Sequence, residues 1–310
     1  MLHVEPFKMA ARIFGRLGFV RFGLRSRLAR AVEDPGDRGL LGSNGATHNS
    51  RKLFRQRFYG GTYVGSTSNY IDWSARYFGA YSIEELALYA DIIKCVPLPH
   101  NVIDIGANVG NHSLFFALKG ASVLAFEPNP DAYELLEQKI RANPGVRIQP
   151  FQKALSDRSA FLELCLPDNK NLGRSSFNKK VGSNTISVEV SRADDLEEIQ
   201  SCSHISYIKI DVEGHELRVL SGLRDTLSSQ RPPVFVECNQ LDRLETLSNL
   251  FPEGYSFYLF DINRAFAYFL NIPGYGLKRV LAGDPIPSAC NILAWPDHRL
   301  PSHLSRKVIS

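Results

Sequence analysis

The sequence predicts an open α/β fold, in which strands and helices alternate along the chain and the strands form a mostly parallel sheet. Three observations predict this fold. An apolar strand candidate at residues 102–105 leads through two glycines into a helical stretch, a second apolar strand candidate follows at 122–126, and a third at 205–210 leads into another helix. Strands that alternate with helices form βαβ units, and in open sheets of this kind ligands bind beyond the carboxyl ends of the strands.

The stretch NVIDIGANVGN, residues 101–111, has the order strand, glycine turn and helix. Such a junction places backbone N–H groups and the positive end of a helix dipole at the sheet edge, where nucleotide-like ligands bind. A dinucleotide site favours G-x-G-x-x-G, but between Gly106 and Gly110 the middle glycine is replaced by Asn108. Asp104, at the end of the strand, would repel a phosphate but could hold an ammonium group or lie near a sulfonium.

Glu127 ends the second strand, 21 residues after Gly106, at the offset expected for a carboxylate that accepts both hydroxyls of a ribose. A glycine turn without room for a pyrophosphate, followed by an acid at the end of each of two strands, favours S-adenosylmethionine over NAD or FAD. Two alternatives stay open. One is an NAD-dependent oxidoreductase, which would need the glycine that Asn108 replaces, and the other is a non-catalytic protein that kept the cofactor site.

Residues 1–50 are predicted to form a basic arm and a linker. Residues 1–60 hold twelve Lys and Arg against four Asp and Glu, and residues 33–50 are rich in Gly, Asp, Asn and Ser. The arm mixes aromatic and aliphatic residues with arginines, so it could lie on an anionic membrane surface or pack as a basic helix on protein.

Residues 51–100 are dense in aromatic side chains and contain a helix candidate from Ser82, with Glu84 or Glu85 near a capping position. This segment is interpreted as a cap over the cofactor cleft, with an aromatic layer packed against the sheet as the alternative.

The remaining elements continue the alternation of strands and helices. They are predicted to form the main cofactor-binding domain, residues 101–296, which is followed by a tail at 297–310. The predicted elements are a helix at 129–141, a strand at 146–153, a turn at 154–157, an inserted hairpin at 160–190, a helix at 193–201, a strand at 233–238, a helix at 240–251 and an antiparallel pair of strands at 256–260 and 290–295. Ser156 and Asp157 lie in the predicted turn, where an adenine ring could be held. The long polar connection of the hairpin is typical of a substrate loop.

Composition narrows the class of protein. With 310 residues, 44% of them hydrophobic, the chain can bury one large α/β core. Five widely spaced cysteines argue against a disulfide framework and a zinc site, and they indicate a reducing compartment. No apolar run of 18 residues and no secretion signal is visible, so we expect a cytoplasmic protein, with peripheral membrane contact through the basic arm as an option.

Ionisable residues are concentrated after the strand at 205–210. Lys209, Asp211, Glu213, His215 and Glu216 fall within eight positions, immediately before a helix. Because buried carboxylates are costly when unpaired, this density predicts a chemical role for at least one of the acids. The alternative is a lysine–acid pair followed by a solvated helix start, where acids are favoured.

With DIGANVGNHS, AFEPNP, ALSD and KIDVEGHELRVLSG in this order, followed by a strand ending in VEC, the chain resembles the FkbM family of S-adenosylmethionine-dependent methyltransferases over residues 100–240. The resemblance implies a class I methyltransferase (Rossmann-like) fold, with a seven-stranded mostly parallel sheet, helices on both faces and an antiparallel edge strand. It also implies that Asp104, Gly106, Asn108 and Gly110 hold the methionine end of the cofactor and Glu127 the ribose. The implied reaction is O-methylation of a hydroxyl on a sugar, a glycan or another natural product.

The resemblance places Asp211 and Glu213 at the reaction centre. Methyl transfer to an alcohol needs in-line alignment and removal of the hydroxyl proton. Asp211 is the first candidate for the base, Glu213 the second and His215 the third. Asp211, Glu213 and Glu237 offer hard oxygen ligands, so a divalent metal ion is an option but is not favoured. The N/D-P-P-Y/F signature of base N-methylation is absent after the fourth strand, and no nucleic-acid partner is expected; the oligomeric state stays open.

Overall fold

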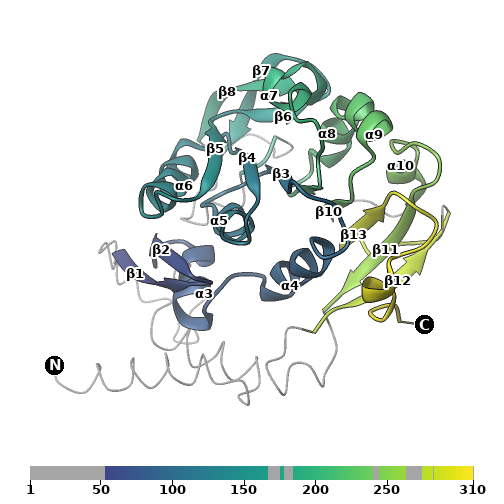
Figure 1. The fold of residues 1–310 in the computed structure, drawn as a ribbon. Coiled ribbons are helices and arrows are strands. Elements are labelled where there is room, and N and C mark those ends of the chain that lie inside the picture. Colours follow the sequence, from purple (N-terminus) through teal and green to yellow (C-terminus); the bar gives the residue numbers. More distant parts are fainter. Residues whose placement is uncertain are drawn as a thin grey trace, which may run out of the picture.

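An eight-stranded sheet runs through the centre of the chain, as the computed structural model shows (Figure 1). The structure describes residues 53–166, 175–177, 184–239, 244–262, 274–281 and 283–309. The basic arm predicted at residues 1–50 therefore lies outside the described residues, as does most of the connection within the inserted hairpin, and contact of the arm with a membrane stays a prediction of the sequence.

The strand order is β12-β11-β13-β10-β9-β3-β4-β5. The bounds are β3 (Asn101–Ile105), β4 (Ser122–Phe126), β5 (Arg147–Phe151), β9 (Tyr207–Ile210), β10 (Val234–Asn239), β11 (Ser256–Asp261), β12 (Gly276–Val280) and β13 (Ala289–Trp295). The five strands from β5 to β10 are parallel. β13 is antiparallel to β10 and to β11, and β12 is antiparallel to β11. The predicted α/β fold is confirmed.

The antiparallel end of the sheet is larger than predicted. The pair expected at 256–260 and 290–295 is present as β11 and β13, with β13 lying between β10 and β11. The edge itself is formed by β12, an eighth strand that sequence analysis missed. Its two exposed middle residues, Lys278 and Arg279, break the apolar pattern of a strand, and such charges are a common way to protect a sheet edge.

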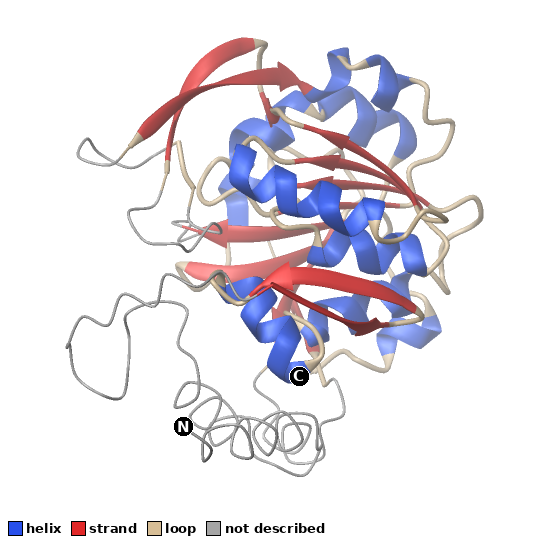
Figure 2. Ribbon diagram, turned by 90° about the vertical axis from the view of Figure 1, so that its left-hand side faces the viewer, coloured by secondary structure: helices blue, strands red, loops and turns tan. Residues whose placement is uncertain are grey.

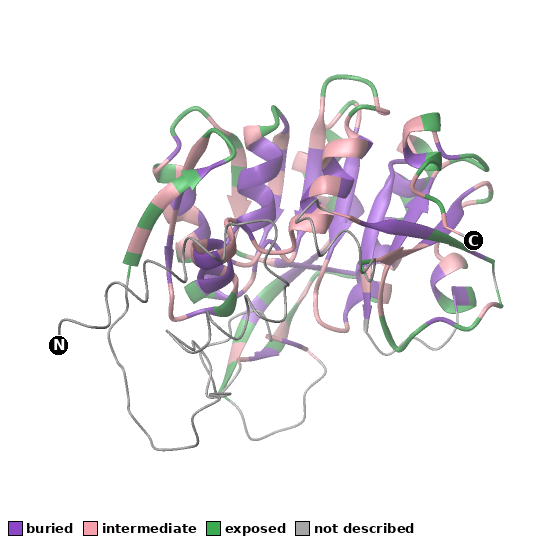
Figure 3. Ribbon diagram, turned by 90° about the horizontal axis from the view of Figure 1, so that it is seen from below, coloured by how far each residue is buried: buried purple, intermediate pink, exposed green. Residues whose placement is uncertain are grey.

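The central strands are apolar on both faces, which is why helices cover both sides of the sheet (Figure 3). Successive residues of β3 point to opposite faces: Val102 belongs to one core cluster, and Ile103 and Ile105 belong to the other. The first face is covered by α4 (Ile83–Ile92), α5 (Asn111–Leu118) and α6 (Pro130–Arg141). The second is covered by α7 (Glu197–Gln200), α8 (Glu216–Gly222), α9 (Arg224–Gln230) and α10 (Leu244–Ser248).

Helix ends follow the sequence to different degrees. Asn129 caps α6 through its side chain and Pro130 occupies the first turn, as predicted. α4 begins directly after Ser82, as predicted, and Glu84 and Glu85 lie in its first turn, but Ser82 makes no side-chain capping bond. The helix predicted at 193–201 is interrupted at Leu196, whose extended backbone separates a 3₁₀ turn, η2 (Ala193–Asp195), from α7.

The N-terminal described segment packs on the face that α5 and α6 cover. It comprises the hairpin β1 (Leu53–Phe58) and β2 (Gly61–Ser66), followed by α3 (Tyr70–Phe78). Its large aromatic side chains are mainly interior, with Tyr63, Trp73 and Tyr77 fully buried. Two of its other residues, Ile71 and Tyr81, line the pocket described below. Most of the large aromatic side chains of this segment thus pack in the interior, and a role as a cover over the cleft stays a prediction of the sequence.

A buried ion pair joins this segment to α6. Asp72 of α3 accepts hydrogen bonds from Lys139 Nζ at 3.0 Å, Tyr63 OH at 2.8 Å, Ser66 N at 2.8 Å and Asn69 Nδ2 at 2.8 Å. The side chains of Asp72 and Lys139 have no exposed surface. The hydrogen bonds that this carboxylate can accept are thus taken up by protein donors.

The predicted inserted hairpin is present as β7 (Ala160–Cys165) and β8 (Thr185–Arg192), which pair antiparallel (Figure 2). Residues 154–157, predicted as a turn, instead begin with a short strand, β6 (Ala154–Ser156), that pairs parallel to β8. These strands form a separate small sheet.

At the other end of the chain, α12 (Ser302–Ser305) contacts α4, where His303 lies 2.8 Å from Asp91. No helix within the described ranges is long and apolar enough to cross a membrane.

Candidate active site

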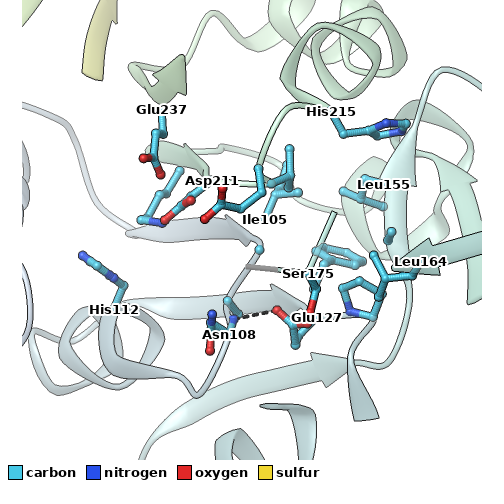
Figure 4. A pocket seen from close by; sticks show the side chains of 18 of the residues that line it. Ile105, Asn108, His112, Glu127, Leu155, Leu164, Ser175, Asp211, His215 and Glu237 are labelled. Carbon is cyan, nitrogen blue, oxygen red and sulfur yellow. Dashed lines mark hydrogen bonds and ion pairs between the residues drawn. The ribbon is translucent and has the colours of Figure 1, made fainter. Parts of the chain in front are cut away.

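A pocket of about 940 Å³, counting its open mouth, lies at the carboxyl ends of β3, β4 and β9 (Figure 4). This is the edge where open α/β sheets bind ligands. In Figure 4 the side chains of Asp211 and Glu237 gather at one end of the pocket, while His215, Leu155 and Leu164 lie at the other and Glu127 lies beside Asn108. The pocket therefore has an acidic end and an end with more apolar character, with a glycine turn between them.

The turn from Gly106 to Gly110 has a left-handed backbone at three positions, with φ of +80° at Gly106, +50° at Asn108 and +82° at Gly110. Asparagine is among the residues that tolerate this conformation, so Asn108 keeps the turn without a glycine. A Cβ atom on Gly106 would lie 1.8 Å from the carbonyl oxygen of Asp211. The turn is thus pressed directly against the backbone that follows β9.

Glu127 joins the turn to the next strand. Its Oε2 accepts a hydrogen bond from Asn108 N and its Oε1 accepts one from Asn129 N, both at 2.8 Å. Burial raises the pKa of this carboxyl to about 7, although the two backbone hydrogen bonds lower it. The two bonds fix the orientation of the carboxylate in the pocket wall and leave lone pairs for hydroxyl donors.

The acidic end is built from Lys209, Asp211 and Glu237. Lys209 Nζ donates to Asp211 Oδ2 at 2.8 Å, and the Lys209 side chain is only 3% exposed. Burial would raise the pKa of Asp211, but the charge of Lys209 and a hydrogen bond with Glu237 hold it below its ordinary value. The charge of Asp211 raises the pKa of Glu237 to about 10. At neutral pH the two carboxyl groups therefore share one proton, with Asp211 ionised.

Two further residues, Glu213 and His112, line the pocket near this acidic end. Glu213 lines the pocket from a left-handed backbone position, φ +52°, and its carbonyl accepts from Ser176 Oγ at 2.8 Å. His112, on the first turn of α5, also lines the pocket. Its Nε2 lies 3.1 Å from Glu85 Oε2, yet the alignment is not that of a hydrogen bond and this buried atom has no hydrogen-bond partner among the described residues.

At the opposite end, Leu155, Leu164 and Phe177 supply apolar surface. His215 packs on the Phe177 ring at a centroid distance of 4.7 Å, and its Nε2 lies 2.9 Å from Ser156 Oγ. Burial lowers the pKa of His215 to about 4, so the ring is neutral at physiological pH. This placement makes His215 part of the wall far from Asp211 (Figure 4).

The structure brings six of the ten predicted site residues to the pocket wall, namely Gly106, Asn108, Glu127, Asp211, Glu213 and His215. The other four lie behind it. Asp104 is fully buried and accepts from Ser113 Oγ of α5 at 2.5 Å, because the alternation of β3 turns its side chain onto that face. Gly110 packs against Leu136, Ser156 contacts His215, and Asp157 pairs with Arg218 at 2.9 Å.

Sequence reasoning missed Tyr81 and His112 as pocket residues and treated Glu237 only as a metal ligand. Asn111 holds the backbone of Tyr81 by two hydrogen bonds, at 3.3 Å and 3.1 Å. The position of His112 just after the glycine turn was the available signal, whereas Tyr81 comes from a separate segment. The described residues contain no group of three His, Cys, Asp or Glu arranged to hold a metal ion.

A family model for the methyltransferase FkbM domain matches residues 104–257. The chain is 32% identical to the hexuronic acid methyltransferase AglP of Haloferax volcanii, with 41% of this chain and 51% of that protein covered. It is 30% identical to methyltransferase sdnD of Sordaria araneosa, with 47% and 72% covered. The crystal structure of a methyltransferase FkbM from Methylobacillus flagellatus KT shares 15% identity at a TM-score of 0.39, over 72% of this chain and 54% of that one.

The chain thus spans about half the length of the hexuronic acid methyltransferase and nearly three quarters of methyltransferase sdnD. The matched region begins at the carboxyl end of β3 and contains β4, β9 and β10, the other strands that contribute residues to the pocket. Taken together with the motif order in the sequence, these matches establish that the chain belongs to the FkbM methyltransferase family.

Proposed function

We propose that this chain transfers a methyl group from S-adenosylmethionine to a hydroxyl oxygen of a sugar, a glycan or another natural product. The observation that carries the proposal is that one pocket brings together a left-handed glycine turn, a carboxylate that can accept ribose hydroxyls and an ionised acid. Gly106 and Asn108 supply the turn, Glu127 the first carboxylate and Asp211 the second.

The side chains that line the pocket suit each part of this cofactor. Glu127 would accept the two ribose hydroxyls, and Leu155, Leu164 and Phe177 would pack on the adenine. The negative charge of Asp211 at the other end suits a positively charged sulfonium rather than a phosphate. When bound, S-adenosylmethionine supplies an electrophilic methyl group on a positively charged sulfur.

The residues at the acidic end would align the acceptor and take its proton. As the acceptor oxygen takes the methyl group, the O–C bond forms, the C–S bond breaks and the oxygen becomes strongly acidic. A carboxylate with a lowered pKa, such as Asp211, is then basic enough to receive the hydroxyl proton. Lys209 keeps Asp211 ionised and fixes its position through the 2.8 Å contact. Most of the acceleration would come from this alignment.

Support for a sugar acceptor comes from the relative whose name states hexuronic acid methylation. An NAD-dependent oxidoreductase is less well supported, because Asn108 occupies the position where a dinucleotide loop has glycine. A non-catalytic protein would have no use for the proton-sharing pair of Asp211 and Glu237.

Calorimetry with S-adenosylmethionine, S-adenosylhomocysteine and NAD, run side by side, tests the cofactor. We expect binding of the first two only. Incubation with methyl-labelled donor and a panel of hydroxyl-bearing glycosides then tests transfer. Binding of NAD alone, or cofactor binding without transfer to any hydroxyl compound in a broad natural-product extract, would contradict the proposal.

A further inference from the structure

A second cavity opens beside the cofactor pocket, between the start of α4 and strands β10, β11 and β13. It encloses about 1260 Å³, counting its open mouth. Glu237 lines both cavities, so the two are neighbours across a single side chain. In-line methyl transfer requires the acceptor oxygen to approach the methyl group from the side opposite sulfur, and therefore from a space that adjoins the cofactor pocket at its acidic end.

The wall between the cavities is a connected set of polar groups. Glu237 on β10 stands directly opposite Asn291 on β13 in the antiparallel register. Asn291 Nδ2 donates to Glu85 Oε1 at 3.3 Å, and Glu85 Oε2 lies 3.1 Å from His112 Nε2 in the cofactor pocket. His112 is 7% exposed, and its Nε2 has no hydrogen-bond partner in the described parts of the chain. A buried ring nitrogen that lies near a carboxylate without forming a hydrogen bond is unusual, and it points to a ligand at this junction.

The chemistry of the second cavity selects a class of ligand. Glu85, Glu237, Asp261 and Asn291 offer oxygen acceptors of the kind that pair with hydroxyl donors, and Phe260 offers an aromatic ring. Lys278 is the one cation among the described residues that line it. Even with Glu237 protonated, the acids Glu84, Glu85 and Asp261 outnumber this lysine and disfavour an anionic ligand, so an uncharged or amine-bearing polyol suits the cavity better than a uronic acid.

We propose that this second cavity is the acceptor site and that it takes an uncharged polyhydroxylated compound, such as a neutral sugar unit, whose reacting hydroxyl lies against Glu237. The inference rests on the proposed methyl transfer. Glu237 orients the hydroxyl, and the proton leaves to the carboxylate pair that Glu237 forms with Asp211 while the O–C bond forms and the C–S bond breaks.

The charge selection is tested with S-adenosylhomocysteine-loaded protein and two matched sets of compounds, neutral methyl glycosides and the corresponding methyl glycosiduronates, as single sugars and as short oligosaccharides. Calorimetry should detect binding of neutral members and at least tenfold weaker binding of their uronate counterparts. Equal or preferential binding of the uronates, or no binding by any neutral member, overturns the assignment. Failure of S-adenosylhomocysteine itself to bind would instead count against the proposed function.

Substitution then locates the site. Asp261→Lys, at the end of β11, should shift the ratio of neutral to uronate affinity by at least tenfold toward the uronate, because it reverses one charge in the cavity. Glu253→Ala removes an exposed carboxylate that lines neither cavity and should leave the ratio unchanged. Both variants should bind S-adenosylhomocysteine like the parent, which also shows that they fold. A ratio that does not move in Asp261→Lys would place acceptor binding elsewhere.

Discussion

Lys139 and Lys209 are both buried, and each forms a short ion pair with an aspartate, but the two aspartates differ in what else they contact. Asp72, the partner of Lys139, is surrounded by protein donors and has no exposed side-chain surface. Asp211, the partner of Lys209, has 31% of its side chain exposed and lines the pocket, with a second carboxyl group beside it.

The difference separates an ion pair that serves stability from one that is placed to exchange a proton with a ligand. Removing one member of a closed, fully desolvated pair leaves an uncompensated charge in the interior, so its main consequence is lost stability. A carboxylate that is paired on one side and open to a cavity on the other can still exchange a proton with a ligand. Pairing with a buried lysine alone would not have told the two aspartates apart.

The largest expected effect is on stability at the closed pair. Asp72→Asn should lower the free energy of unfolding by roughly 3–5 kcal/mol, because Lys139 loses its counter-charge in a fully buried place. Denaturant unfolding measures this. Glu134→Gln, which breaks the exposed pair with Arg141, is the control and should change stability little. An equally small loss in Asp72→Asn would erase the distinction.

At the open pair the expected loss is catalytic. Asp211→Asn keeps the shape of the side chain but removes the proton acceptor, so single-turnover methyl transfer should fall by about 100-fold or more, the usual size of such an effect. Unfolding free energy and S-adenosylhomocysteine affinity should change much less. If the loss were instead accompanied by chelator inhibition of the unmutated enzyme that Mg²⁺ reverses, the acid would be serving a metal ion.

Cofactor affinity should depend on Glu127 to a smaller extent. Glu127→Gln keeps one oxygen that can accept from the turn, but it removes the charge and replaces the second acceptor, which Asn129 N uses, by an amide donor. S-adenosylmethionine binding should weaken by roughly 10-fold or more, given about 1.5–3 kcal/mol for a hydrogen bond to a charged group. Calorimetry measures the loss. Asp157→Asn, outside the pocket, is the matched control, and an unchanged affinity in Glu127→Gln would remove the ribose assignment.

The smallest expected effect is a pH dependence that sets Glu127 apart from Asp211. The pKa of Glu127 is raised to about 7, and its ionised form is the better acceptor for ribose hydroxyls, so affinity should rise as pH increases through 7 and level off above it. Between pH 6 and pH 8 the gain should be about 10-fold at most. The pKa of Asp211 lies far below this range and contributes no change. The dependence of S-adenosylmethionine affinity on pH should vanish in Glu127→Gln.

The part of the pocket around the glycine turn was more predictable from sequence than the part around Tyr81 and Asn291, for a physical reason. The turn from Gly106 to Gly110 and the acid at Glu127 belong to one βαβ unit, β3, α5 and β4, so their spacing along the chain encodes their geometry. Asn291 and Tyr81 reach the site from strands and turns that only the tertiary fold brings together. No local pattern encodes such a meeting.

The direction in which side chains point was also difficult to predict from the sequence. Asp104 was predicted to face the ligand, but β3 turns it toward α5, and Ser156 was predicted in a turn that proved to be a strand with Leu155 facing the pocket instead. In a strand a shift of one residue exchanges the two faces, so a residue's presence near the sheet edge does not settle which way its side chain points.

Gly106 carries a consequence for protein engineering. Because any side chain there would collide with the carbonyl of Asp211, the glycine turn and the backbone that follows β9 can lie this close only with glycine at this position. A library of variants aimed at new methyl donors would disturb Asp211, the proposed base, whenever it changed this position. Asp261 and Lys278 contact neither the turn nor the cofactor pocket, so variation there offers a way to retarget the acceptor while the donor machinery stays constant.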